Sequence, residues 1–304
     1  MKVVVAGGSG WIGTALVRSL IADGHEVVIL SRSTRGGRTS SPTRQVTWDG
    51  RSIGPWADEL GGADAVVNLS GKSVADGRWN EQRKRELWTS RTESTATLVG
   101  AIERAKVRPP ILVNASAVGY YGDRGDRVAT EADPPGDDFL ARLVVDWERT
   151  ALEAERSGIR VCLMRTGIVF GRVGSVLDKL SLPFRFFVGG HIGSGQQWVS
   201  WVHIDDVVGL YRFAIERTDA SGPINVTAPE PVTNKRLSQT LGAVLGRPSW
   251  MPVPGFAVRL AVGEIAEQIL TGQRVMPSVA ERLGYIFQHP TLVGALRSSL
   301  ARAA

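Results

Sequence analysis

The sequence predicts an α/β protein in which helices cover both faces of a doubly wound parallel sheet, with a smaller, mostly helical C-terminal domain. Over the first 171 residues, apolar runs of strand length alternate with stretches of helical apolar spacing. Such alternation favours a parallel sheet that is buried on both faces. After Gly171, glycine and proline become frequent and the alternation stops, which indicates a second structural unit.

The chain opens with a strand, a glycine-rich turn, a helix and a second strand. Residues 2–6 (KVVVA) form a strand-length apolar run, and residues 11–22 carry the apolar spacing of a helix that Gly24 ends. The run EVVILSR (26–32) is the second strand, which completes a βαβ unit. Further strands are expected in the apolar runs 63–71, 111–119 and 159–171, and helices at 81–104 and about 139–157.

The C-terminal part contains one more run of strand type, PINVTA (223–228). From Lys235 onward it reads as helices separated by proline- and glycine-rich stretches. We therefore predict that residues 1–171 form the first domain and that residues 200–228 return to it. The smaller domain is expected to comprise residues 172–199 and 229–304.

Composition argues against several classes of protein. A chain of 304 residues that is 43% hydrophobic and 22% charged is expected to be globular. Its one cysteine, Cys162, lies in an apolar run and is expected in the core rather than as a reactive thiol. No uninterrupted apolar run reaches the roughly 18 residues of a membrane helix. The N-terminus also lacks a signal-peptide pattern, so we expect no membrane insertion and a cytoplasmic location.

The net charge of +6 favours an anionic small molecule over nucleic acid as the partner. Nucleic-acid binding requires basic residues clustered on one face. Here they are scattered, apart from RKR at 83–85. We expect no nucleic-acid partner.

The turn GGSGWIG places Gly7, Gly10 and Gly13 three positions apart, after a strand and at the start of a helix. In the Rossmann-type arrangement the first glycine allows a tight turn, the second lets a pyrophosphate approach the backbone, and the third lets helix and strand pack closely. The free amides at the start of the helix then bind the phosphates. A purely structural turn is the alternative. Dinucleotide contacts are expected from Gly7, Ser9, Gly10, Trp11, Ile12 and Gly13.

The end of the second strand indicates which dinucleotide is bound. An NAD site carries Asp or Glu there, to bond the ribose 2′-hydroxyl. Here Ser31 and Arg32 occupy the place, with Arg35 and Arg38 close behind. A guanidinium without a carboxylate suits a 2′-phosphate, so NADP(H) is the expected cofactor. The alternative, a solvated loop arginine, fits Arg35 and Arg38 better than Arg32.

The next strand ends should line the same cofactor, because the carboxyl ends of parallel strands face the ligand crevice. The run VVNLSG ends in Asn68, Leu69, Ser70 and Gly71. An ordinary strand-to-loop transition, with polar side chains bonding backbone groups, is the alternative. Two more cofactor contacts are expected from Arg91 and Ser116.

The stretch LVNASAVGYYGDRGD (112–126) is where chemistry is expected. A serine and a tyrosine at a strand end can polarise a carbonyl or hydroxyl beside a nicotinamide, so Ser116 and Tyr121 are the catalytic candidates. Arg165 lies within an apolar strand, where an arginine needs a partner. For Trp201, a packed aromatic loop is an equal alternative to a substrate contact. The substrate-binding candidates are Tyr120, Arg165, Gln196 and Trp201.

Several motifs together resemble a known family. They are the glycine turn, NLSG (68–71), SAVGYYG (116–122), RTGIVFG (165–171) and SWVHIDDVV (200–208), and the similarity continues to the C-terminal TGQRVMPSVAERLGYIFQHP. The chain thereby resembles an atypical branch of the extended short-chain dehydrogenase/reductases, the epimerase family proteins or nucleoside-diphosphate-sugar epimerase-like (YfcH-like) group. The resemblance implies a Rossmann-type domain, a nicotinamide cofactor and a crevice between two domains, but no known substrate.

In extended members of this family the segment WVHIDD (201–206) links the two domains. Hydrogen bonding between domains is therefore the leading interpretation of His203, Asp205 and Asp206. A general acid or base role for His203 is the alternative. We predict no metal site.

The wider superfamily performs its reductase chemistry with a tyrosine and a lysine four positions apart on a helix, and this pair is missing here. The four tyrosines are followed, four positions later, by Arg124, Gly125, Ile215 and His289. Alignment of Glu148 with the superfamily's acidic residue puts Leu140 and Val144 at the pair's positions. Counting back from the YG-D motif at 121–123 places Ala117, not Ser116, at the usual serine position.

Two functions therefore stay open from the sequence. The first is an NADP(H)-dependent oxidoreductase or epimerase that acts on a small polar substrate, for example a nucleotide-linked sugar. The second is a non-catalytic NADP(H)-binding redox sensor or partner-binding scaffold. The oligomeric state is not predicted.

Overall fold

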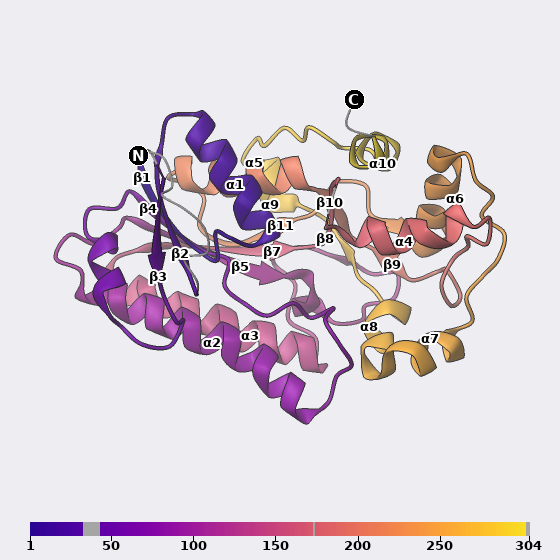
Figure 1. Cartoon of the computed structure of the whole chain (residues 1–304), viewed down its shortest axis with the longest axis horizontal. Coiled ribbons are helices and arrows are strands. Elements are labelled where there is room, and N and C mark those ends of the chain that lie inside the picture. Colours follow the sequence, from indigo (N-terminus) through magenta and orange to yellow (C-terminus); the bar gives the residue numbers. More distant parts are fainter. Residues whose placement is uncertain (33–42, 173, 302–304) are drawn as a thin grey trace.

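The computed structural model describes residues 1–32, 43–172 and 174–301, and Arg35 and Arg38 lie outside these ranges. Its centre is a sheet of seven parallel strands, which confirms the predicted fold class (Figure 1). In spatial order the strands are β11 (Gly222–Val226), β7 (Arg160–Thr166), β5 (Ile111–Ala117), β4 (Ala65–Asn68), β1 (Lys2–Ala6), β2 (Glu26–Ser31) and β3 (Thr43–Thr47).

The strand order reverses at β1. This strand lies between β2 and β4, with Val4 in register with Val28 on one side and with Val66 on the other. In an open α/β sheet such a reversal creates a crevice at the carboxyl ends of the strands, where ligands bind. The sheet topology therefore points to the loops that follow β1, β2 and β4.

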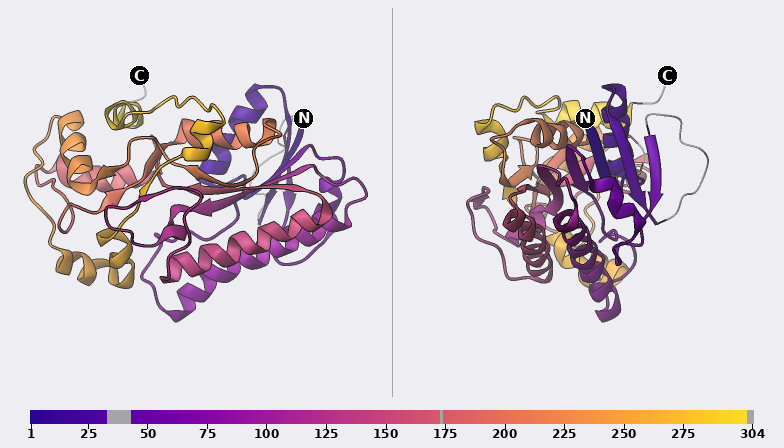
Figure 2. Two further views of the ribbon diagram at one scale, coloured as in Figure 1. Left: turned by 180° about the vertical axis from the view of Figure 1, so that it is seen from behind. Right: turned by 90° about the vertical axis from the view of Figure 1, so that its left-hand side faces the viewer.

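Helices cover both faces of the sheet (Figure 2). One face carries α1 (Trp11–Ala22), α5 (Ile204–Glu216) and α9 (Ser278–Arg282), and the other carries α2 (Glu81–Arg104) and α3 (Phe139–Leu152). Each face buries its own apolar cluster. Cys162 belongs to the first cluster, and burial raises the pKa of its thiol to about 11, as expected of a core cysteine.

The remaining helices of the C-terminal part gather mainly at the end of the molecule away from β3 (Figure 1). They are α4 (Val176–Arg185), α6 (Asn234–Leu245), α7 (Gly255–Val262), α8 (Ala266–Leu270) and α10 (Leu292–Leu300). Three short strand pairs accompany them: β8 (Ile168–Phe170) with β10 (Trp201–His203), β9 (Trp198–Val199) with β12 (Val232–Thr233), and β6 (Val128–Ala129) with β13 (Arg274–Val275). The division into two domains stays a prediction.

Three segments differ from the sequence-based expectations. The run 159–171 forms two strands because the chain breaks at Gly167, where a Cβ would lie 2.4 Å from the Ser200 carbonyl oxygen. The expected helix at 139–157 is α3 followed by a 3-10 turn at Glu153–Ser157. Strand β3 was not predicted, because its residues TRQVT form a half-exposed edge strand without an apolar run. Further 3-10 turns lie at Pro55–Leu60, Val118–Tyr121 and Gly263–Ile265.

Within the ranges that the structure describes, none of the helices combines the length and the apolar character needed to span a bilayer.

Candidate functional site

The turn between β1 and α1 requires glycine for steric reasons. Gly7 has a φ of +76°, a conformation that side-chain-bearing residues rarely adopt. A Cβ at Gly13 would lie 2.5 Å from the Gly7 carbonyl oxygen and 2.7 Å from the Gly8 Cα. The start of α1 therefore sits directly against the turn. Gly10 is the N-cap of α1 and has no side chain to bond the first amides, so these are directed toward the crevice.

A pocket of about 280 Å³ opens beside this turn, at the ends of β1, β2 and β4. Its position matches the ligand crevice expected where the strand order reverses. The predicted cofactor residues that line it are Gly7, Ser9, Gly10, Ser31, Arg32, Leu69, Ser70 and Gly71.

The far wall of the pocket was not predicted from the sequence. It consists of the loop after β3 together with one side of α2, and neither carries a local motif. Their contribution depends on how the helix packs over the sheet, which residue spacing alone does not reveal. The additional lining residues are Leu30, Trp48, Asp49, Gly50, Arg51, Lys72, Glu86, Thr89, Ser90, Glu93 and Ser94.

Arg32 lies at the exposed edge of the pocket, directly after β2. It forms no ion pair with any acidic side chain in the described ranges. The neighbouring Ser31 hydroxyl accepts a hydrogen bond of 2.6 Å from the Gln45 side chain on β3. This arrangement leaves the guanidinium available to an anionic group at the place where a dinucleotide's adenosine ribose would lie.

Asn68 and Arg91 shape the pocket without lining it. The Asn68 side-chain amide donates to Thr95 Oγ1 at 2.9 Å and to Asn114 Oδ1 at 2.7 Å, and its carbonyl accepts from the Ser70 amide. This favours the alternative in which Asn68 stabilises the strand end. Arg91 donates to two backbone carbonyls, those of residues 87 and 72, and burial lowers the pKa of its guanidinium to about 10. It therefore fixes the loop that carries Gly71.

Two residues of the turn, Trp11 and Ile12, also lie outside the pocket lining. The Trp11 indole packs on the loop after β8, where a Cβ at Gly171 would approach it to 2.7 Å. Ile12 packs against the apolar core beneath the sheet.

Ser116 belongs to a buried ion-pair network. Its hydroxyl donates to Glu148 Oε1 at 2.5 Å. The same carboxylate accepts two bonds of 2.8 Å from Arg165, through Nε and Nη2. All three side chains are buried. Burial alone would lower the pKa of Arg165, yet the bonds to Glu148 outweigh it and raise the pKa above its usual value. Arg165 thus has its partner inside the protein, which argues against the predicted ligand contact.

Tyr121 is also part of this network, and its predicted catalytic role is not supported by its position. Its ring is fully buried, and its hydroxyl donates to Asn225 Oδ1 at 2.7 Å while it accepts from Arg165 Nη1 at 3.1 Å. Burial raises the pKa of the phenol to about 12. A buried hydroxyl with two protein partners and a raised pKa is poorly placed to transfer a proton to a substrate. Ser116 is also buried and bonded to Glu148, and it does not line the pocket.

Tyr120 lies at the boundary between this network and an apolar cluster. Its ring is half-buried, and the Arg165 guanidinium carbon lies 3.4 Å from the ring centre. The cluster that Tyr120 joins contains Leu140 and Val144, the two positions where the superfamily's tyrosine and lysine were expected. Its other members include Trp79, Leu87, Trp88, Phe139 and Leu143. Apolar packing therefore replaces the polar pair.

The two remaining substrate candidates differ in their exposure to solvent. Gln196 is exposed, on the loop before β9. Trp201 is fully buried, stacks on Phe170 at 5.7 Å between ring centres and donates its indole N–H to the Glu230 carbonyl oxygen. The packed-aromatic alternative holds for Trp201, since a buried ring with a satisfied N–H has no surface left for a ligand.

Replacement of Tyr121 by phenylalanine should lower the free energy of unfolding by about 1–3 kcal/mol, because Asn225 Oδ1 and Arg165 Nη1 each lose their buried hydrogen-bond partner. NADPH affinity should stay nearly unchanged, since Tyr121 does not line the pocket. Urea unfolding and a cofactor titration measure the two effects. Tyr120→Phe is the matched control, because the Tyr120 hydroxyl has no hydrogen bond to the described residues, and it should lose much less stability. An equal loss in both variants would contradict this account.

Comparison with known proteins gives two family matches. The model described as the NAD dependent epimerase/dehydratase family matches residues 3–227. A second model, described as a domain of unknown function (DUF1731), matches residues 253–299. Together the two models match most of the chain, including its C-terminal part.

Similar proteins match over nearly the full length. The epimerase family protein SDR39U1 homolog, chloroplastic, from Arabidopsis thaliana is 41% identical over 303 residues, which are 98% of this chain and 86% of that protein. The crystal structure of the human epimerase family protein SDR39U1 with NADPH has a TM-score of 0.88 at 37% identity and covers 98% of this chain and 99% of that one. A UDP-glucuronic acid 4-epimerase from Bacillus cereus, at 18% identity, has a TM-score of 0.80 with 98% of each chain covered, and shows the fold alone.

Proposed function

Because this chain belongs to the NAD-dependent epimerase/dehydratase family, we propose that it binds NADP(H) and acts as an oxidoreductase or epimerase on a small polar substrate, such as a nucleotide-linked sugar. The observation that carries the cofactor assignment is the pocket beside the glycine turn, whose β2 end presents Arg32 where an NAD site has a carboxylate. The NADPH in the human SDR39U1 structure supports the same cofactor.

The pocket residues divide into three groups by what they would bind. The turn from Gly7 to Gly13 and the first amides of α1 would hold the pyrophosphate, and Arg32 would pair with the 2′-phosphate. The loop 69–72 follows β4 and would border the path from ribose toward nicotinamide. When bound, the cofactor supplies the hydride chemistry. This chain's residues would hold it, orient it and exclude water.

Replacement of Arg32 by aspartate should weaken NADPH binding by about 2–3 kcal/mol, because charge-assisted bonds to the phosphate are lost and a like charge replaces them. NADH binding should change little, since NADH has no 2′-phosphate. Calorimetric titration with both cofactors measures the difference.

Arg18→Asp is the matched control. Arg18 is an exposed residue of α1 outside the pocket lining, and this variant carries the same change of charge. Its effect on NADPH affinity should be small. Any loss of affinity in Arg18→Asp measures the long-range electrostatic effect of the charge change, and it is subtracted from the loss in Arg32→Asp. Equal losses of NADPH and NADH affinity in Arg32→Asp would remove Arg32 from the 2′-phosphate site.

A second function, an NADP(H)-binding redox sensor or scaffold, is favoured by one observation. Leu140 and Val144, which the sequence alignment assigns to the positions of the superfamily's proton-transfer pair, pack in an apolar cluster, and the Tyr121 hydroxyl bonds Asn225 in the interior. Incubation of the NADPH-loaded or NADP⁺-loaded protein with a panel of nucleotide sugars separates the two functions. Oxidation, reduction or epimerisation supports the enzyme, while tight cofactor binding without conversion of any compound supports the sensor.

The substrate contacts in this proposal come from Tyr120 and Gln196, the two substrate candidates with exposed surface. The UDP-sugars in the structures of proteins with a related fold are ligands of those proteins. Because those proteins have low sequence identity to this chain, a nucleotide-linked sugar as its substrate stays a proposal. A cytoplasmic location likewise stays a prediction.

A further inference from the structure

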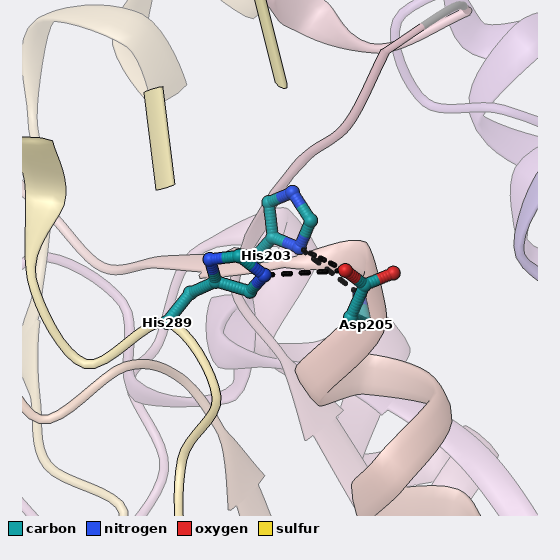
Figure 3. A group of neighbouring side chains, drawn as sticks. All are labelled: His203, Asp205 and His289. Carbon is teal, nitrogen blue, oxygen red and sulfur yellow. Dashed lines mark hydrogen bonds and ion pairs between the residues drawn. The ribbon is translucent and has the colours of Figure 1, made fainter. Parts of the chain in front are cut away.

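Three titratable side chains, two from one short segment and one from the C-terminal part of the chain, converge beside the start of α5 (Figure 3). Asp205 Oδ2 lies 3.3 Å from His203 Nδ1 and 3.2 Å from His289 Nε2. His203 ends β10, Asp205 is in the first turn of α5, and His289 belongs to the segment between α9 and α10. None of the three lines the cofactor pocket, so the cluster is separate from the proposed cofactor site.

The backbone places the His289 ring independently of its side-chain contacts. The fully buried carboxylate of Asp206 accepts hydrogen bonds from the Gln288 amide at 2.7 Å and from the His289 amide at 2.9 Å. The Tyr285 hydroxyl donates to the same carboxylate at 3.2 Å. These bonds fix the C-terminal segment on α5 and hold His289 opposite Asp205. The three side chains thus form a preorganised group.

The spacing and exposure of the group suit metal binding. The ring centres of His203 and His289 are 3.8 Å apart, and His203 is buried. Both rings are therefore close enough for their nitrogen atoms to approach one ion, and imidazole nitrogen is a common metal ligand. The Asp205 side chain is half-exposed. Its exposed side gives a path from solvent.

The distances within the group also fit a shared ion. Charge-assisted hydrogen bonds between nitrogen and a carboxylate are usually about 2.7–2.9 Å long, shorter than the two contacts seen here. Ligand atoms around a tetrahedral zinc ion, with bonds of about 2.0–2.1 Å, lie roughly 3.3 Å apart. The separations of 3.3 Å and 3.2 Å match that spacing, and the three ligand atoms all lie within 4.8 Å of one another.

We propose that His203, Asp205 and His289 bind a divalent transition-metal ion of the zinc class, which would join the C-terminal segment to α5. Two imidazoles and a carboxylate are ligands that such ions accept, and a solvent molecule on the exposed side would complete the coordination. Binding would replace the direct contacts of Asp205 Oδ2 with His203 Nδ1 and His289 Nε2. It would also displace the bond of 3.2 Å from the Asp205 amide to His203 Nδ1. Sequence analysis predicted no metal site, because His289 lies 84 positions from Asp205.

The test is a titration of the full-length protein with Co²⁺ as the spectroscopic probe. We expect visible absorption of four- or five-coordinate Co²⁺ that saturates at one ion per chain and is displaced by Zn²⁺. Saturating Zn²⁺ should also raise the melting temperature, and a chelator should reverse the rise. No saturable absorption together with no change of melting temperature would overturn the proposal.

Two variants and two controls assign the ligands. His289→Ala and Asp205→Asn change side chains with exposed surface and leave the Asp206 bonds intact, so both should fold and lose at least tenfold in Co²⁺ affinity. His191→Ala controls for other histidines. His25→Ala removes the histidine whose Nδ1 lies 3.5 Å from the N-terminal amine, which could bind metal by itself. Binding that survives His289→Ala but is lost in His25→Ala would also overturn the proposal.

Discussion

Replacement of Gly13 by alanine should abolish measurable NADPH binding, with a loss of at least about 100-fold in affinity, equivalent to about 2.7 kcal/mol. The added Cβ would lie 2.5 Å from the Gly7 carbonyl oxygen and 2.7 Å from the Gly8 Cα. Both contacts are with backbone, so only a displacement of the turn or of α1 can relieve them. That displacement moves the amides that would bind the pyrophosphate. Overpacking should also destabilise the fold by about 1–3 kcal/mol.

Gly100→Ala in α2 is the matched control for this substitution. A Cβ at Gly100 meets only the Ile53 side chain, at 3.6 Å, and the position is helical. Alanine there should stabilise the helix by up to about 1 kcal/mol and leave cofactor affinity unchanged. A cofactor titration and urea unfolding of both variants measure the effects. If Gly13→Ala binds NADPH as well as the unmodified protein, the glycine turn is not the pyrophosphate site.

The substitution Arg165→Met should lower the free energy of unfolding by about 3–5 kcal/mol, because it leaves the buried Glu148 carboxylate without its bidentate partner. The Tyr121 hydroxyl and the Tyr120 ring lose a contact in the same step. NADPH affinity of the fraction that remains folded should change little, since Arg165 does not line the pocket.

The double variant Arg165→Met with Glu148→Gln separates two contributions to the loss of stability, the broken ion pair and the lost packing. It removes the unpaired buried charge and should recover a substantial part of the stability lost in the single variant. Denaturant unfolding of the single and double variants gives the coupling. If Arg165→Met leaves stability unchanged but weakens the binding of a ligand, Arg165 is instead a ligand contact in the crevice.

Sequence reasoning succeeded where the signal is local. The glycine turn from Gly7 to Gly13 directly follows a strand and leads into a helix. Backbone sterics alone explain why these positions require glycine. The arginine at the end of β2 is recognisable for the same reason. The parallel sheet with helices on both faces follows from apolar runs alternating with helices.

Sequence reasoning failed where the decisive contacts are long-range. Ser116 bonds a residue 32 positions later, and Tyr121 bonds one 104 positions later, so both looked like free polar groups at a strand end. The wall that α2 contributes to the pocket depends on how the helix packs, which apolar spacing does not resolve. Strand β3 was not predicted because an edge strand with polar residues lacks the apolar run of a buried strand.

The measurement that tests the central claim most directly is a calorimetric titration of the unmodified protein with NADPH and with NADH at the same ionic strength. The account predicts that NADPH binds at least about 30-fold more tightly, because the 2′-phosphate gains about 2 kcal/mol from the cationic end of β2. The titration with NADPH should saturate at one cofactor per chain. Equal affinities, or tighter binding of NADH, would contradict the account.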